Sequence, residues 1–383
     1  MKIVLSDNNL HKNFRPITLT RPVAEIRFGI LTIKETWTRH FLNCLVEPVF
    51  FYETENYLEC KYPYENFYDI KVAGNVKPTL DLVRQILALE KNQSLYVNFK
   101  WVATKGNKEI SKKNIELTDF IYIEHIWELF QKNDKAISLD YRILTKDKIT
   151  QPISTTNTVI NPINIFIEEG AKVECAILNA SSGPIYIGKN AEVMEGCMIR
   201  GSFALLENAT LKMGAKIYGA TTIGAYCKVG GEVSNSIFQS YSNKGHDGFL
   251  GNSIVGEWCN FGADTNSSNL KNNYGKLKIY DYNFGELKQT NIMFCGVLMG
   301  DHSKTGINTM LNTATTVGVS ANIFGGGFPP KYIPSFSWGG SEQSPKFILE
   351  KAFEVSENMM KRRKVSLSVK DKKILTYIFE NNL

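Results

Sequence analysis

His246 is the residue best suited to acid–base chemistry in the second half of the chain, and it lies in the stretch QSYSNKGHDGFLGN, residues 239–252. An imidazole titrates close to neutral pH, so it can take a proton from a nucleophile. Gly245, Gly248 and Gly251 give the surrounding backbone the freedom to carry the side chain outward. We therefore expect a general base at this position, with a surface histidine on a bulge as the alternative.

The second half has too few histidines to form a zinc site from histidines alone. The second half contains only two histidines, His246 and His302. A zinc ion bound by histidines on a coil of this kind needs three of them.

A six-residue repeat surrounds this stretch. Branched aliphatic residues recur at every sixth position over residues 187–229, and the residue four positions later is usually Ala, Cys or Thr. The aliphatic positions are Ile187, Val193, Ile199, Leu205, Leu211, Ile217, Ile223 and Val229. The spacing returns at Met299, Thr305, Leu311, Val317 and Ile323.

This spacing predicts a parallel β-helix. Six residues of an α-helix advance about 600°, so every sixth residue cannot share one helix face. A coil with three flat sides of six residues turns one aliphatic residue inward per side and takes about 18 residues in all. We place this domain at residues 161–344 and expect a helical tail, 345–383, to cover its end.

The repeat loses its register after Val229. Ile237 and Ile254 lie off the six-residue spacing, and a polar insertion follows at residues 264–291. A long segment without a strong period inside a compact domain is usually functional or disordered. We expect the insertion to be too polar for core, to protrude and to form a wall of the site.

The first half of the chain follows a different pattern. Residues 1–130 contain only three of the 29 glycines, and short apolar runs alternate with helical spacing, as in residues 26–41. This alternation predicts βαβ units around a mainly parallel sheet. We assign residues 1–135 to an α/β domain and 136–160 to a polar connector.

The composition of the chain argues against two classes of partner, nucleic acids and membranes. The net charge of +6 is modest and the dense basic runs are short, which argues against nucleic acid. No apolar stretch approaches the roughly 18 residues of a membrane span, and the apolar run at the start is too short for a signal peptide. Seven cysteines without a CxxC pair fit a reducing compartment. We expect a cytoplasmic protein without a membrane partner.

Residues 242–275, SNKGHDGFLGNSIVGEWCNFGADTNSSNLKNNYG, resemble the acetyltransferase segment of the bifunctional GlmU enzymes. These enzymes acetylate glucosamine-1-phosphate with acetyl-CoA and then uridylate it to UDP-N-acetylglucosamine. The stretches LTRPVAEIRFGILTIKETW and NIFGGGFPPKYIPSFSWGG are similar to an alternative GlmU-like group of about this length. The resemblance implies a nucleotidyltransferase-like α/β domain, a left-handed β-helix and a homotrimer.

The resemblance also implies roles in acetyl transfer. His246 corresponds to the family's general base and Asn260 to an asparagine that binds the sugar. Asn273 and Tyr274 correspond to the Asn-Tyr pair that contacts acetyl-CoA.

Other positions of the motif are ambiguous or altered. Lys276 or Lys278 stands near the family's sugar-binding lysine, and Phe249 replaces a tyrosine that contacts the sugar. Ser234 and Asn235 occupy the place of an expected basic residue. These losses of polar contacts leave the acceptor's identity open, because such contacts set discrimination between substrates.

The first domain departs further from the family. Nucleotidyltransferases of this class cradle a triphosphate on a Gly-rich loop, yet residues 6–20 contain no glycine. Arg15, Arg21 and Arg27 could bind phosphate instead, or could pair with local acids. Asn98 stands where a metal-binding aspartate is expected, so Mg²⁺ remains an open alternative.

Two functions are compatible with these residues. The first is acetyl-CoA-dependent N-acetylation of an amino-sugar phosphate, coupled to nucleotidyl transfer from a nucleoside triphosphate toward UDP-N-acetylglucosamine. The second is an acyltransferase for another sugar, with a first domain that only senses or binds a sugar nucleotide. Turnover of UTP with N-acetylglucosamine-1-phosphate separates them.

Overall fold

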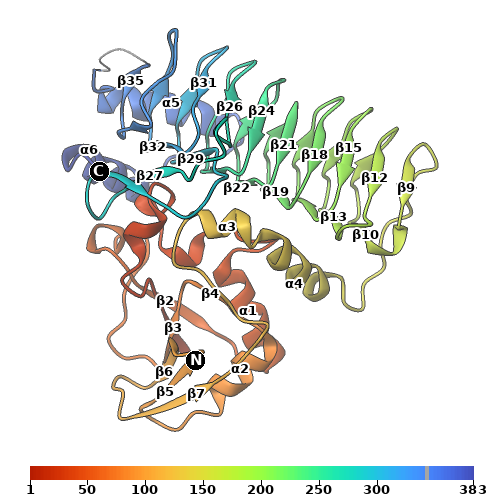
Figure 1. Ribbon diagram of the computed structural model, residues 1–383. Helices are drawn as coiled ribbons and strands as arrows, with labels where there is room; N and C mark the ends of the chain where they lie inside the picture. The colour runs from red at the N-terminus through yellow and green to blue at the C-terminus, as the bar shows by residue number, and fades with distance from the viewer. Residues whose placement is uncertain (341–344) are drawn as a thin grey trace. The chain divides into compact units, whose positions relative to one another are not determined.

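The structure of the protein, a computed structural model, describes residues 1–340 and 345–383 (Figure 1). The chain forms two compact units. The first contains residues 1–26 and 31–126, and the second contains residues 27–30 and 127–383. Along the chain, the second unit resumes after Ile126, whereas the predicted division at residue 135 stays a prediction. The predicted β-helix boundary at residue 344 lies outside the described residues. Within the described part of the chain, none of the helices has the length and apolar character that crossing a membrane requires.

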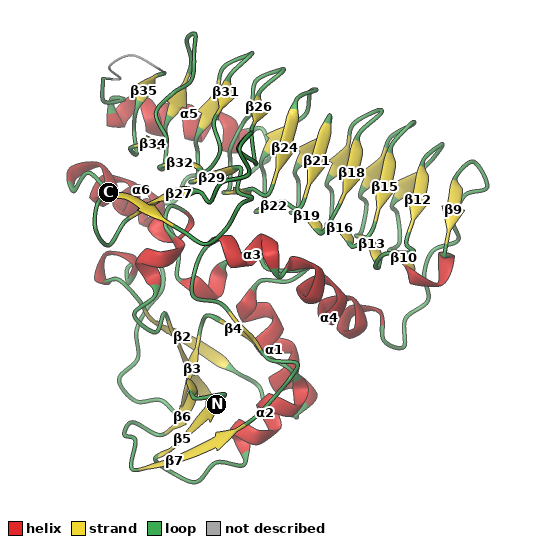
Figure 2. Ribbon diagram, in the orientation of Figure 1, coloured by secondary structure: helices red, strands yellow, loops and turns green. Residues whose placement is uncertain are grey.

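The first unit is built on a six-stranded sheet in the order β2-β1-β3-β6-β5-β7, with α1 and α2 packed on it (Figure 2). Its elements are β1 (Lys2–Ser6), α1 (Ile33–Asn43), β2 (Val49–Glu53), β3 (Ile70–Ala73), β4 (Val76–Lys77), α2 (Leu80–Leu87), β5 (Gln93–Val97), β6 (Lys100–Lys105), β7 (Ser111–Ile115) and β8 (Ile121–Tyr122). Three 3-10 turns, η1 (His11–Phe14), η2 (Ile17–Leu19) and η3 (Val23–Glu25), fill the segment between β1 and α1, and η4 (Asn56–Leu58) follows β2.

The sheet is mixed but mainly parallel, as predicted, because β6 is the one strand of the six that runs against the others, and β5 and β7 pair in parallel. β1 pairs in parallel with β2 and β3, but β6 runs antiparallel to both β3 and β5. The cause is a tight turn at Asn98 and Phe99, where both φ angles are positive, at 49° and 63°. Two such residues in succession form a hairpin turn of the kind that returns a strand beside its predecessor.

α1 begins later than the apolar spacing of residues 26–41 suggests. Thr32 and Glu35 form a reciprocal capping box, which satisfies backbone N–H groups at the helix start. Trp37 and Phe41 are buried and stack on each other, so this face of the helix belongs to the core. The cap places the helix start at Ile33, and the residues before it follow a different path.

The second unit opens with α3 (Trp127–Gln131) and α4 (Asn133–Thr145). The predicted connector at residues 136–160 therefore contains most of a helix. α4 buries Ala136, Ile137 and Leu144, and Asp140 accepts a hydrogen bond from the backbone of Ile30 at 2.8 Å. This helix is a packed element of the second unit.

The predicted fold class is confirmed, because a parallel β-helix follows α4 (Figure 1). We call its three sides face 1, face 2 and face 3, in the order in which the chain visits them within one coil after Ile165. Face 1 consists of β10 (Ile165–Ile167), β13 (Ile185–Ile187), β16 (Phe203–Leu205), β19 (Thr221–Ile223), β22 (Ile237–Phe238), β25 (Ile254–Val255), β29 (Val297–Met299), β32 (Thr315–Val317) and β34 (Tyr332–Ile333). The short turn η5 (Pro162–Asn164) precedes it.

The other two faces are built from equally short strands. Face 2 consists of β11 (Lys172–Val173), β14 (Glu192–Val193), β17 (Thr210–Leu211), β20 (Lys228–Val229) and β23 (Asn243–Lys244), and it continues through bridges at Asn260 to β30 (Lys304–Thr305), β33 (Asn322–Ile323) and β35 (Trp338–Gly339). Face 3 consists of β9 (Thr158–Ile160), β12 (Ile177–Asn179), β15 (Met198–Arg200), β18 (Lys216–Tyr218), β21 (Glu232–Ser234), β24 (Phe249–Gly251), β26 (Asn266–Ser267) and β31 (Met310–Leu311).

The six-residue repeat is the core of this coil. Every aliphatic residue of the run from Ile187 to Val229 is buried, and Leu205 pairs with Ile223, which is 18 residues on. Burying one such side chain contributes about 1.5–3 kcal/mol, so the column of aliphatic residues is the main stabilising term of the domain. The thiols of Cys197, Cys227 and Cys259 are buried in the same core.

Two helices, α5 (Leu349–Lys361) and α6 (Val369–Glu380), form the tail, where one terminal helix was expected. They pack against the coil that contains β35. The Phe336 and Phe379 rings meet edge to face at 5.2 Å, and the Trp338 and Phe347 rings lie 4.6 Å apart. The backbone of Phe347 also donates to the carbonyl of Phe336 at 2.6 Å.

We expect deletion of residues 345–383 to destabilise the β-helix and to cause aggregation, because it exposes Phe336, Trp338 and the strand edge beneath them. Melting temperature and light scattering measure both effects. A truncated protein that stays monodisperse with an unchanged melting temperature would contradict this role of the tail.

Candidate functional site

The coil shortens at the break in the repeat, where Ile223 pairs with Phe238, 15 residues on, and the next inward position holds a charged residue. Val229 pairs with Lys244, only 15 residues on, so Lys244 takes the inward position that an aliphatic residue holds in the preceding coils. Its side chain is 2% exposed, and its ammonium donates to the carbonyls of Gly230 at 3.1 Å and His246 at 2.9 Å. Burial lowers the pKa of Lys244 to about 8. The interior of the β-helix is therefore polar at this coil.

His246 is turned outward on the bend between β23 and β24. Its side chain is exposed, while its carbonyl faces inward to the Lys244 ammonium. Of the three glycines thought to permit this bend, Gly248 is the one that the bend demands. Its φ is +113°, and a Cβ there would lie 2.3 Å from the carbonyl oxygen of Thr265. Lys244 inside and Gly248 at the bend thus fix the direction of the imidazole.

A pocket of about 750 Å³ contains His246. It lies at the corner between faces 2 and 3, and its polar lining includes Asn243 and Asn260, which are neighbours along face 2. The side-chain oxygen of Asn243 is buried and has no hydrogen-bond partner among the described residues. Buried acceptors are normally satisfied, so this oxygen is suited to a donor group on a ligand.

Basic side chains also line the pocket, and Lys228 is the neighbour of Asn243 on face 2. We call Lys212, Lys228, Arg362 and Arg363 the basic wall; all four line the pocket. The two lysines come from face 2, and the two arginines directly follow α5 in the tail. Sequence reasoning missed this wall, because no motif marks the short basic run at residues 361–364. Its proximity to Lys228 depends on how the tail folds back along the coil.

The insertion is more ordered than predicted. It contains the hairpin of β27 (Lys278–Asp281) and β28 (Glu286–Gln289). Leu277 and Ile279 are buried, and the ring of Tyr280 stacks on Tyr332 with centroids 3.4 Å apart. The expectation that this segment is too polar for core was therefore wrong for these residues.

Asn273 and Tyr274 do not line the His246 pocket. The insertion leaves the coil after face 3 and rejoins it at face 1, whereas His246 lies at the corner between faces 2 and 3. Tyr274 is 69% exposed, and the Asn273 side chain accepts a hydrogen bond from the backbone of Gly275 at 3.0 Å. Within one chain, the predicted base and the predicted cofactor contact therefore lie at different corners.

The three remaining predicted sugar contacts also lie outside the lining of this pocket. Phe249 is on face 3, where its backbone N–H donates to the side chain of Asn266. Lys276 is exposed and donates to Asn291 at 3.0 Å, and Lys278 is exposed on β27. Of the predicted site residues, the structure brings His246 and Asn260 together.

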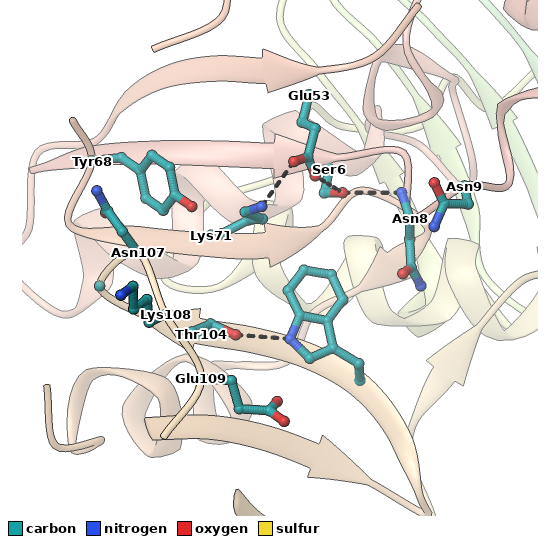
Figure 3. A pocket seen from close by; sticks show the side chains of 12 residues that line it. Ser6, Asn8, Asn9, Glu53, Tyr68, Lys71, Thr104, Asn107, Lys108 and Glu109 are labelled. Carbon is teal, nitrogen blue, oxygen red and sulfur yellow. Dashed lines mark hydrogen bonds and ion pairs between the residues drawn. The ribbon is translucent and has the colours of Figure 1, made fainter. Parts of the chain in front are cut away.

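A second pocket, of about 390 Å³, lies in the first unit near the carboxyl ends of β1 and β2 (Figure 3). Glu53 accepts from Ser6 at 2.5 Å and from Lys71 at 2.8 Å, and the Ser6 hydroxyl accepts from the backbone of Asn8. Ligands of α/β sheets commonly bind outside the carboxyl ends of strands. None of these three linked side chains had been predicted, since no motif marks them.

The predicted phosphate-binding arginines do not line this pocket. Arg15 and Arg21 are buried, and Arg15 pairs with Glu55 at 3.8 Å. Arg27 belongs to the second unit, where its backbone N–H donates to Gln239 at 2.8 Å and its guanidinium to the carbonyl of Ile30. Pairing with a local acid, the alternative left open by the sequence, thus describes Arg15.

Asn98 lies in the hairpin turn between β5 and β6. Its side chain donates to the carbonyl of Leu117 at 3.0 Å and accepts from the Leu117 backbone at 3.3 Å, so it braces the turn. Over residues 1–340 and 345–383, no three His, Cys, Asp or Glu side chains cluster in a way that could hold a metal ion. The residues present therefore do not fit a magnesium site at Asn98, and no step below depends on one.

We expect Lys244→Met to increase the free energy of unfolding at pH 7 by up to about 3 kcal/mol and to have little effect near pH 10.5. The unfolded lysine has a pKa of 10.5 and the folded one about 8, so the unfolded state binds more protons between these values and the wild-type protein gains stability as pH rises through them. Urea denaturation at both pH values measures the difference. An equal change in the free energy of unfolding at both pH values would show that burying the charged Lys244 ammonium does not destabilise the protein.

Comparison with known proteins agrees with the two-part architecture. The family model described as sugar nucleotidyl transferase matches residues 3–149. The bifunctional protein GlmU of Synechococcus elongatus is 26% identical over 231 residues, which cover 54% of this chain and 46% of that protein. The bifunctional protein GlmU of Wigglesworthia glossinidia brevipalpis is 22% identical over 269 residues, covering 60% of this chain and 54% of that protein. The chain thus spans about half the length of the curated relatives it matches.

Among solved structures, a UDP-N-acetylglucosamine acyltransferase from Arabidopsis matches with a TM-score of 0.25 and 15% identity, over 56% of this chain and 80% of that chain. A UDP-N-acetylglucosamine acyltransferase from Campylobacter jejuni matches with a TM-score of 0.23 and 15% identity, over 60% and 96%. Scores this low carry no argument about this chain. The family match and the curated relatives support the predicted class, a transferase. Residues 3–149 thus match the sugar nucleotidyl transferase family, and the chain is similar to the bifunctional GlmU proteins.

Proposed function

We propose that the second unit transfers an acetyl group from acetyl-CoA to the amine of an amino-sugar phosphate, glucosamine-1-phosphate in the first instance. The observation that carries this proposal is the exposed His246 imidazole in a pocket that also presents Asn243, Asn260 and the basic wall. An imidazole supplies a base, the amides supply hydrogen bonds to a sugar, and the wall supplies positive charge for phosphate.

In the proposed reaction, acetyl-CoA supplies the acyl group as a thioester. His246 takes a proton from the amine as its nitrogen bonds to the acyl carbon, and the carbon–sulfur bond then breaks to release coenzyme A. The unpartnered oxygen of Asn243 can accept the amine's other N–H group and so orient its lone pair. Asn260, next along face 2, is placed to bind a sugar hydroxyl.

We further propose that the site is completed by a second copy of the chain in a homotrimer. The insertion with Asn273 and Tyr274 lies at a different corner from His246, so in this proposal it lines the histidine pocket of a neighbouring subunit. A three-sided coil has no deep cleft of its own. The groove between two coils would give the pantetheine arm of acetyl-CoA two walls.

For the first unit we propose nucleotidyl transfer from a nucleoside triphosphate to the acetylated sugar-1-phosphate, giving UDP-N-acetylglucosamine when the triphosphate is UTP. The match to the sugar nucleotidyl transferase family supports it. A second candidate, binding of a sugar nucleotide without transfer, is favoured by the packing after β1. There Phe14, Ile17 and Leu19 are fully buried, and the backbone is not displayed as a phosphate loop. Pyrophosphate release from UTP and N-acetylglucosamine-1-phosphate separates the two candidates.

We expect His246→Ala to lower the rate of acetyl transfer by about 100-fold or more, because a positioned base contributes about that factor. Thiol detection of released coenzyme A measures the rate. Asp247→Ala is the matched control, since Asp247 is the exposed neighbour of His246 and does not line the pocket. A His246→Ala enzyme with wild-type turnover would rule out the histidine as the base.

We expect Tyr274→Ala to raise KM for acetyl-CoA more than KM for the sugar, because its role in the proposal is to place the cofactor. Trimers mixed from Tyr274→Ala and His246→Ala chains should regain activity, since some of their sites combine an intact loop with an intact histidine. If mixed trimers stay inactive while each variant is well folded, each loop serves the histidine of its own chain.

A further inference from the structure

The basic wall of the His246 pocket has no acidic counterpart in the described chain. Within residues 1–340 and 345–383, no carboxylate forms an ion pair with Lys212, Lys228, Arg362 or Arg363. The pKa of Lys228 is lowered, first by partial burial and then by the nearby charges of Arg363, Lys212 and Arg362. Glu192, on the same face, raises the pKa of Lys228, but it is the weakest of the influences on that pKa.

The two arginines are held in place by the tail. The backbone of Arg363 donates to the carbonyl of Met360 at 2.9 Å, and Val365 donates to the same carbonyl at 3.1 Å. Met360 is buried, so this turn is anchored against the protein. Arg362 is exposed and Arg363 is half-buried, which leaves their guanidinium groups available to the pocket. Like charges gathered on an anchored turn repel one another until an anion is bound.

We infer that the basic wall binds a phosphate group of a substrate, with Arg362 and Arg363 of the tail as its principal ligands. This inference rests on the proposed function for the site of the reaction, but it assigns the phosphate to residues that no motif marks. Guanidinium groups form paired hydrogen bonds to phosphate oxygens, and lysines add point charges. The tail therefore has a second role besides covering the coil, since it carries half of the wall.

The basic wall also takes the place of a basic residue that the resemblance leads us to expect elsewhere. Ser234 and Asn235 stand where a basic residue is expected, and Ser234 is buried on face 3. The phosphate ligands on the basic wall come instead from face 2 and from the tail. The amino-sugar phosphate and coenzyme A both present a phosphate group to such a wall, and the test below distinguishes these two sources.

The test measures binding by calorimetry to the full chain carrying Arg362→Gln and Arg363→Gln together. The ligands are glucosamine-1-phosphate and coenzyme A, each compared with its phosphate-free counterpart, glucosamine and pantetheine. We expect the Kd of one phosphate ligand to rise about tenfold or more, as for loss of charge-assisted hydrogen bonds. The counterparts should bind the variant as they bind the wild type. The matched control is Lys361→Gln, which removes an adjacent charge that does not line the pocket.

The ligand that weakens identifies the source of the phosphate. An unchanged Kd for both phosphate ligands, in a variant with the wild-type melting temperature, would overturn the inference. Equal weakening by Lys361→Gln would also overturn it, because the effect would then be one of net charge. These measurements report binding and require no catalysis. Their outcome therefore tests the phosphate-binding role separately from acetyl transfer.

Discussion

A buried ammonium group holds the bend of the β-helix that carries His246. Parallel pairing fixes each coil on the one before it, so Lys244 must lie above Val229, inside a core that is otherwise aliphatic at this position. Burying a charge is costly unless polar groups satisfy it, and the nearest such groups are carbonyls of the bend itself. By binding the carbonyl of His246 from within, Lys244 holds the backbone of the residue whose imidazole points to solvent. The polar interior and the outward histidine are thus one arrangement.

The regular part of this architecture could be predicted from the sequence because it depends on a local period. Positions such as Ile187, Leu205 and Ile223 are fixed by spacing alone, and the structure places each in the core. His246 and Asn260 could be predicted as a pair because both lie in the motif-rich stretch beside the break. The inward position of Lys244 could not be predicted from the spacing, because the six-residue repeat is already interrupted before this residue.

Other features depend on contacts between distant parts of the chain. Arg362 reaches the pocket only because the tail returns along face 2, which no period encodes. The burial of Leu277 and the stacking of Tyr280 on Tyr332 order an insertion whose composition indicated a polar loop. In the first unit, the hairpin at Asn98 reverses β6 alone, so one strand of a mainly parallel sheet runs antiparallel. In each case tertiary contacts override the local pattern.

The central claim is that the His246 pocket acetylates an amino sugar that carries a phosphate. The most direct measurement is release of coenzyme A from acetyl-CoA by the wild-type chain, assayed with a panel of amino sugars both free and 1-phosphorylated. The account predicts stoichiometric release of coenzyme A with a 1-phosphorylated amino sugar, glucosamine-1-phosphate first, and much slower release with its free counterpart. Absence of release with every amino sugar in the panel would contradict it.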